Sequence, residues 1–249
     1  MTLLAVERIK LFSTRSPWWC MAIAALITVG FGLIPALVNN RSEPVSVGST
    51  QIGFMFGLMV MMVMAALAVT TEYRFSTIRT TFQAVPNRTA ALLAKTVVVA
   101  VLAAVVGELA AFGAWAANTV VRPEADLTID LADEWRTVAG AGLVYLLAAV
   151  LAVAVGVLVR QSAAAVTVLL VHVLLLEGLI GEIPGVGDEL YRWMPFNNVF
   201  NFISTPDSMP KEQVLERAAF MPWGSLAYFA AIAIGLLVVA LAVANRRDA

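Results

Sequence analysis

Six long apolar segments decide what this chain can fold into. Each is a continuous run close to the ~20 residues that an α-helix needs to cross the hydrocarbon core of a bilayer. The runs are 18–38, 51–70, 96–121, 137–159, 163–180 and 223–244. The strands of an outer-membrane barrel would be short and would alternate apolar with polar residues. The sequence therefore predicts an all-α membrane protein with one transmembrane domain over residues 1–249.

The composition favours a membrane location and excludes several kinds of chemistry. Hydrophobic residues make up 61% of the chain and charged residues 13%, against about half and about a quarter in soluble domains. The dipeptide Gly-Lys is absent, so no P-loop can bind nucleotide. One histidine and one cysteine, Cys20, leave no metal cluster and no internal disulfide. We expect no catalytic residue, no bound cofactor and no nucleic-acid partner.

The basic residues set the predicted orientation, because Lys and Arg gather in cytoplasmic loops. If the N-terminus is cytoplasmic, the inner segments hold ten of the 16 basic residues and three acidic ones. The outer segments then hold six basic and twelve acidic residues. Six spans place both termini in the cytoplasm. The excess of Arg over Lys, with abundant Ala and Val, is typical of a GC-rich bacterial genome.

Two segments outside the spans are predicted to lie along the membrane. Residues 1–17 read as an interfacial helix in which Ala5, Ile9 and Phe12 share a face and Pro17 ends the helix; a frayed tail is the alternative. The outer segment 181–222 contains apolar stretches at 193–196 and 199–203, and residues 211–220 read as a short helix. Because these pieces are too short to span, we expect re-entrant or interfacial structure.

The inner loop 71–95, TEYRFSTIRTTFQAVPNRTAALLAK, is long, whereas the other inner loop has three residues. In a helix that stops before Pro86, the side chains of Phe75, Ile78 and Phe82 share one face. An apolar stripe with flanking positive charge is typical of a helix that binds in a groove of another protein. The residues that we assign to such docking are Glu72, Arg74, Phe75, Ile78, Arg79 and Phe82.

Three ionisable residues fall within spans, where charge is costly and a functional role is the first hypothesis. Glu108 and His172 lie at matching depth in the third and fifth spans, so they can form a hydrogen-bonded pair. Such a pair would act as a proton relay or as a polar position in a substrate path. A structural pair, or a protonated Glu108 bonded to a backbone carbonyl, is the alternative. Glu177 is five residues beyond His172, about 140° round an ideal helix, and is expected on another face, near the outer water.

The second span combines close packing with adaptable side chains. Gly53 and Gly57 have the spacing that lets two helices approach closely. Methionine suits adaptable apolar surfaces, so Met55, Met59 and Met62 are candidates for a substrate-facing lining. Ordinary packing in the core or against lipid is the alternative.

The order of these segments resembles the bacterial ABC transporter type-2 permeases, actinobacterial members included. The shared pattern is an interfacial helix, six spans, a long first inner loop, a minimal second inner loop and re-entrant pieces before the last span. The loop is the most specific part: TEYR leads through TIR and P-x-R to Lys95. The resemblance covers essentially the whole chain and is weakest over 181–222.

The resemblance implies the permease subunit of an ATP-driven exporter in the bacterial cytoplasmic membrane. In that family the helix in this loop is the coupling helix, which docks on a separate ATPase chain that binds ATP and Mg. Two permeases, identical or related, pair with two ATPase subunits. By resemblance, spans two and five form the translocation path and the contact between permeases. The apolar interior suits a hydrophobic or amphipathic substrate.

Two other functions remain open from the sequence. A proton-coupled secondary transporter would use Glu108 and His172, although the inverted repeats and interrupted helices common in such folds are not visible. A membrane scaffold that transports nothing would use the loop 71–95 only to recruit a cytoplasmic partner.

Overall fold

The computed structural model describes residues 2–38, 45–85, 87–204, 216 and 218–246. In these residues the regular structure is helical and no strand occurs. Six helical segments are long and apolar enough to cross a membrane, which confirms an all-α, multi-pass membrane protein. The segments are Ser16–Val38, Gly48–Arg74, Arg88–Val121, Ala141–Val159, Ser162–Gly181 and Pro222–Arg246.

Several of these spans consist of more than one helix. The elements are α1 (Leu3–Phe12), α2 (Ser16–Gly32), α3 (Ile34–Val38), the 3-10 turn η1 (Gly48–Gln51), α4 (Phe54–Arg74), α5 (Thr77–Ala84), α6 (Arg88–Val121), α7 (Ala132–Ala139), α8 (Ala141–Val159), α9 (Ser162–Val171), the π-helical turn η2 (His172–Leu176), α10 (Glu177–Gly181), α11 (Gly187–Arg192), α12 (Pro195–Ile203) and α14 (Pro222–Arg246).

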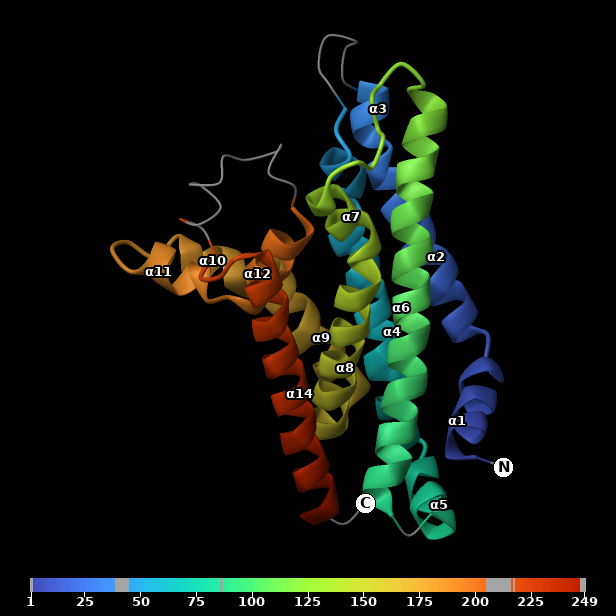
Figure 1. The fold of residues 1–249 in the computed structure, drawn as a ribbon. Coiled ribbons are helices and arrows are strands. Elements are labelled where there is room, and N and C mark those ends of the chain that lie inside the picture. Colours follow the sequence, from blue (N-terminus) through green and yellow to red (C-terminus); the bar gives the residue numbers. More distant parts are fainter. Residues whose placement is uncertain (1, 39–44, 86, 205–215, 217, 247–249) are drawn as a thin grey trace.

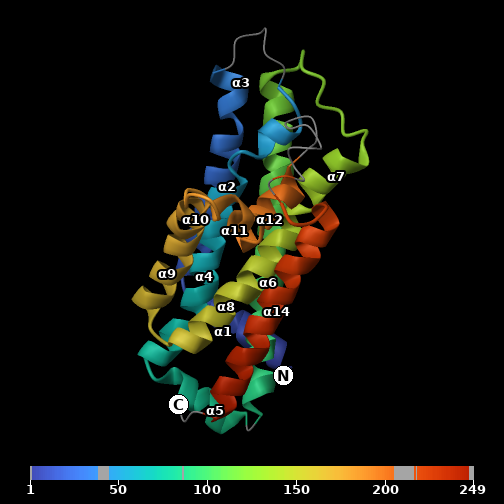
Figure 2. The same cartoon turned by 90° about the vertical axis from the view of Figure 1, so that its left-hand side faces the viewer.

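Helix α8 lies at the centre of the bundle, between α4, α6, α9 and α14 (Figures 1 and 2). Its side chains are mostly Ala, Val and Leu, and small residues let neighbouring backbones approach closely. Helices α1 and α5 and both described ends of the chain lie at one end of the bundle, which we call the α5 end. We call the opposite end, near α7, the α7 end. Which side of the membrane the α5 end faces stays a prediction.

The third span begins earlier than hydropathy predicts, so 71–95 is not a continuous loop. Helix α6 starts at Arg88 because Asn87 Oδ1 accepts a hydrogen bond from the backbone N–H of Ala90 at 3.0 Å and caps the helix. Its 34 residues correspond to about 51 Å, well beyond the ~30 Å hydrocarbon core. Lys95 therefore lies on a helix, two turns after its start.

The N-terminal segment also differs from the expectation. Helix α1 ends at Phe12, and Pro17 lies in the first turn of α2, where the N–H that proline lacks would have no partner. Ile9 is exposed, whereas Glu7 is buried. The face of α1 that packs against the bundle thus carries the carboxylate of Glu7.

Tyr145 on α8 joins the central spans. Its hydroxyl donates to the carbonyl oxygen of Phe54 at 3.0 Å and lies 3.2 Å from Thr28 Oγ1. Gly57 of α4 and Gly107 of α6 make room for this side chain: a Cβ at Gly57 would overlap the hydroxyls of Thr28 and Tyr145, and one at Gly107 would overlap the tyrosine ring. Gly53 packs in the same way on the backbone of α2.

We expect Gly57→Leu to lower the free energy of unfolding by about 2–3 kcal/mol, because the new side chain forces α2 and α8 away from α4. Thermal unfolding in lipid nanodiscs measures the loss. Gly235→Leu on α14 is the matched control, since no atom lies within 4 Å of a Cβ at that position. Equal melting temperatures for the two variants would contradict the close approach.

Helices α11 and α12 lie beside α10 and the start of α14 (Figure 1). Helix α12 packs along α14, and polar side chains join the two helices. Ser225 Oγ donates to Asn198 Oδ1 at 2.9 Å, and Asn201 Nδ2 donates to Ser225 Oγ at 2.9 Å. The helix expected over 211–220 lies largely outside the described residues.

Candidate functional site at the α5 end

Helices α4 and α5 form a tight hairpin at the α5 end. Phe75 ends α4, and Ser76 has a left-handed backbone with φ of 58°, which redirects the chain before α5 begins at Thr77. Such a conformation costs a non-glycine residue about 1–2 kcal/mol. The sequence TEYRFSTIRTTF is therefore two helices rather than one.

The break makes the predicted apolar stripe wrong as a single docking face. Ile78 is 2% exposed and belongs to the core of the bundle. Phe82 is half-buried against that core, with the Arg88 guanidinium 5.4 Å from its ring centre. Phe75 is 68% exposed and lies outside α5. The three side chains share a face only in an uninterrupted helix, and Ser76 divides the segment into two helices.

The exposed face of the hairpin is positively charged and carries one aromatic ring. The Arg74 guanidinium lies 5.4 Å from the centre of the Phe75 ring, and Arg79 is exposed on α5. We call this face the hairpin tip; it comprises Arg74, Phe75, Ser76, Thr77, Arg79, Thr80 and Gln83.

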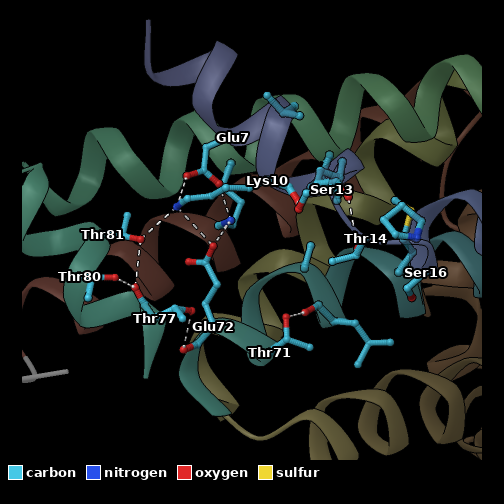
Figure 3. Close-up of a pocket in the computed structure, with 18 residues that line it drawn as sticks. Glu7, Lys10, Ser13, Thr14, Ser16, Thr71, Glu72, Thr77, Thr80 and Thr81 are labelled. Atoms are coloured by element: carbon cyan, nitrogen blue, oxygen red, sulfur yellow. Dashed lines mark hydrogen bonds and ion pairs between the residues drawn. The ribbon is translucent and has the colours of Figure 1, made fainter. Parts of the chain in front are cut away.

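Behind the hairpin, four charged side chains from three helices form a cluster (Figure 3). Lys95 Nζ donates to a carboxylate oxygen of Glu7 and, at 2.9 Å, to Glu72 Oε1. Lys10 Nζ lies 2.9 Å from Glu7 Oε1 and 3.5 Å from Glu72 Oε1, and it donates to Thr81 Oγ1 of α5 at 3.0 Å. Glu72, which the stripe placed on a partner-facing helix, thus points inward.

This charge cluster is largely buried and electrically neutral. The side chains of Glu7, Lys95 and Glu72 are 5%, 8% and 13% exposed, and that of Lys10 is 37% exposed. Burial raises the pKa of Glu7, but attraction to Lys95 and hydrogen bonds from both lysines outweigh it and hold that pKa below its ordinary value. Burial lowers the pKa of Lys10, and its bonds to the two carboxylates reverse the sign.

Acid should therefore weaken the hold of α1 on the bundle. Because the pKa of folded Glu7 is lowered, its contribution to stability is present above about pH 4.5 and is lost as the pH falls through the folded value. The melting temperatures of wild type and Glu7→Gln, measured from pH 7 to pH 3, should differ at neutral pH and converge in acid. A difference that does not change with pH would contradict this role of the carboxylate.

A cavity of about 560 Å³ adjoins the charge cluster and is lined by α1, the start of α2, α4, α5 and α6. One wall is apolar and includes Met64, Leu67 and Val99. The other wall carries the charge cluster and several hydroxyl side chains, as Figure 3 shows. This volume lies within the range of sites for small organic molecules.

The predicted pair of Glu108 and His172 is wrong. Glu108 Oε2 accepts a hydrogen bond from the backbone N–H of Gly142 at 3.1 Å, in the first turn of α8. Backbone N–H groups in a first helical turn lack partners within the helix, so a carboxylate there is favourable. His172 instead lies 3.2 Å from Glu177, measured from Nε2 to Oε1.

The contact between His172 and Glu177 depends on the π-helical turn η2. A π-turn closes i→i+5 bonds, which brings residues five apart together and makes the expected 140° separation wrong. Glu177 is also not near water: it is 4% exposed, and its two oxygens accept from the backbone N–H groups of Phe196 and Asn197, both at 2.8 Å. Glu177 thus caps the start of α12.

The methionines of α4 are packed within this chain. Met59 and Met62 are 7% and 1% exposed, and Met55 is half-buried. Met55 also lines a second, smaller cavity of about 230 Å³ at the α7 end, beside Phe200 of α12. The buried positions favour the packing interpretation over a continuous substrate-facing row.

Sequence reasoning missed Glu7 and Lys95, the two most deeply buried members of the charge cluster. Lys95 carried a usable signal, because a lone lysine next to a long apolar run requires a partner. Among the described residues, no three His, Cys, Asp or Glu side chains converge on a site for a metal ion. A scan against protein-family models finds no match to this chain, and a search among curated proteins finds none either.

Proposed function

We propose that this chain is the membrane-spanning permease subunit of an ATP-driven exporter. A separate ATPase would bind the hairpin tip, and a second copy of the chain or a related permease would complete the assembly. The loop resemblance and the missing P-loop support this reading. A hydrophobic or amphipathic substrate in a bacterial cytoplasmic membrane belongs to the same proposal.

The observation that carries the proposal is the linkage of α5 to three other helices. Helix α5 continues from α4 through the turn at Ser76, and Thr81 of α5 accepts from Lys10 of α1. Lys10 and Lys95 then connect α1 and α6 to Glu72 of α4. A partner that pulls on the hairpin tip would therefore move α1, α4 and α6 together.

The geometry also changes which residues we assign to the proposed contact with the partner. Phe75, Arg74 and Arg79 are available on the surface, whereas Ile78 and Phe82 hold α5 to the bundle. Exposed Phe beside two arginines suits a groove with an apolar floor and acidic rim. Glu72 would transmit movement rather than touch the partner.

Co-expression with the product of any neighbouring gene that encodes a P-loop ATPase tests the proposal. We expect the ATPase to co-purify with the wild type and to be lost at least about tenfold, equivalent to 1.4 kcal/mol, with Phe75→Ala plus Arg79→Glu. Phe200→Ala, which truncates a phenylalanine that is 52% exposed at the α7 end, is the matched control. ATP-dependent substrate uptake into inverted vesicles should fall in parallel.

Three results would decide against the proposal. Recovery of the ATPase with the double variant at wild-type level would remove the hairpin tip as its binding site. Transport that needs a proton gradient and persists without ATP would favour a secondary transporter. Stable binding of the ATPase without any movement of substrate would favour a scaffold.

A further inference from the structure

The cavity beside the charge cluster has a chemical bias that the proposed docking of an ATPase does not use. Its polar wall carries hydroxyl groups that donate to backbone carbonyls three to five residues earlier in the chain. These hydroxyls belong to Ser13, Thr14, Thr71, Thr77, Thr80 and Thr81, with distances of 2.6–3.4 Å. A hydroxyl that has donated its hydrogen can only accept further bonds, so these hydroxyl groups present acceptors.

Glu72 adds a stronger acceptor to the same wall. Its Oε1 interacts with Lys95 and Lys10, whereas Oε2 is buried and has no hydrogen-bond partner among the described residues. Buried polar atoms in native proteins nearly always have a partner. A donor that displaces Lys10 and lets the Glu72 carboxylate turn toward the cavity would supply the missing bond.

We propose that this cavity binds a protonated organic amine that carries an apolar body. The ammonium would donate to Glu72 Oε2 and to the surrounding hydroxyl oxygens, and the apolar body would lie against Met64 and Leu67. Exposed Ser13 and Thr14, in the turn between α1 and α2, mark the rim through which the amine enters. The site lies within one chain and requires no ATPase.

The added positive charge is balanced by movement of Lys10. Of the two lysines in the charge cluster, Lys10 has the exposed side chain, 37% against 8% for Lys95, so its ammonium can swing into water when the amine arrives. The amine then replaces Lys10 beside Glu72, while Lys95 keeps both carboxylates. If the proposed function holds, the same movement breaks the bond from Lys10 to Thr81 and reports occupancy to α5.

Fluorescence titration of the purified full chain tests the site. The probe is dansylcadaverine, which has a primary ammonium and an environment-sensitive ring, and the chain is held in nanodiscs of phosphatidylcholine. We expect saturable binding to wild type, weakened about tenfold by Glu72→Gln and strengthened severalfold by Lys10→Gln. Opposite shifts from two members of one cluster cannot come from loss of fold alone.

Matched probes and variants separate the cavity from the bilayer. N-acetylated dansylcadaverine has lost the ammonium and should bind wild type about tenfold more weakly. Ala68→Leu fills the apolar side of the cavity without changing a charged residue and should also weaken binding, whereas Ala116→Leu on the exposed face of α6 should not.

Each contrary result overturns the proposal. Equal affinity for the two probes, or no effect of Ala68→Leu, would mean that the dye partitions into lipid and that the cavity holds water only. Weaker binding with Lys10→Gln would mean that Lys10 is part of the site rather than a competitor. Failure of the proposed function would not affect this test, because the titration uses this chain without an ATPase.

Discussion

Replacing Lys95 with methionine is expected to lower the free energy of unfolding by about 3–5 kcal/mol, the cost of breaking a buried ion pair from one side. Glu7 and Glu72 are 5% and 13% exposed, and Lys95 contacts both. Without it, two buried carboxylates share Lys10 alone and repel each other. Helix α1 should then detach from α6, since the ion pair between Glu7 and Lys95 joins these two helices.

Thermal unfolding in nanodiscs and limited proteolysis near residue 13 measure the two effects. Lys10→Met is the matched control, because that side chain is 37% exposed and its removal should cost about 1 kcal/mol. A Lys95→Met protein as stable as Lys10→Met would show that the charge cluster does not hold α1.

Glu177→Ala should release the start of α12, with an expected loss of about 2–5 kcal/mol. The Glu177 carboxylate accepts from the backbone N–H groups of Phe196 and Asn197, and each buried donor left unpaired costs about 1–3 kcal/mol. Glu177→Gln retains one acceptor oxygen and should lose less. Hydrogen exchange over Pro195–Ile203 should accelerate most in the alanine variant.

Glu189→Ala is the control for this prediction, since that side chain is 69% exposed on α11 and its loss should change stability by no more than about 0.5 kcal/mol. Unchanged exchange over α12 in Glu177→Ala would mean that packing on α14 alone fixes the helix. In that case the π-helical turn, which aims Glu177 at α12, would have no structural consequence there.

The spans and the helical class were predictable because burial in lipid requires long, continuous apolar segments. The polar ends of the spans were not. Helix α6 begins at Arg88 through the cap at Asn87, and a hydropathy argument does not register capping. Because hydropathy does not detect the cap at Asn87, it places Lys95 in a loop rather than in α6.

The site was less predictable, since its contacts depend on tertiary structure and local exceptions. Lys95 meets Glu7 across 88 positions of sequence. One left-handed residue, Ser76, separates Phe75 from Ile78, and the π-helical turn η2 brings His172 to Glu177. A periodicity of 3.6 residues describes uninterrupted helices, and the errors at Ser76 and at η2 each fall at an interruption.

Helix α6 has no such interruption, and this makes it a stiff lever. Near one end Lys95 is bound to Glu7 and Glu72, and near the other Asn118 Nδ2 donates to the carbonyl oxygen of Gly32 at 2.9 Å. A tilt of about 10° around the middle of a rod ~51 Å long displaces each end by about 4 Å, in opposite directions. A small displacement of Lys95 would therefore also displace Asn118 and disturb its hydrogen bond to Gly32. The helix between the two residues would keep its structure.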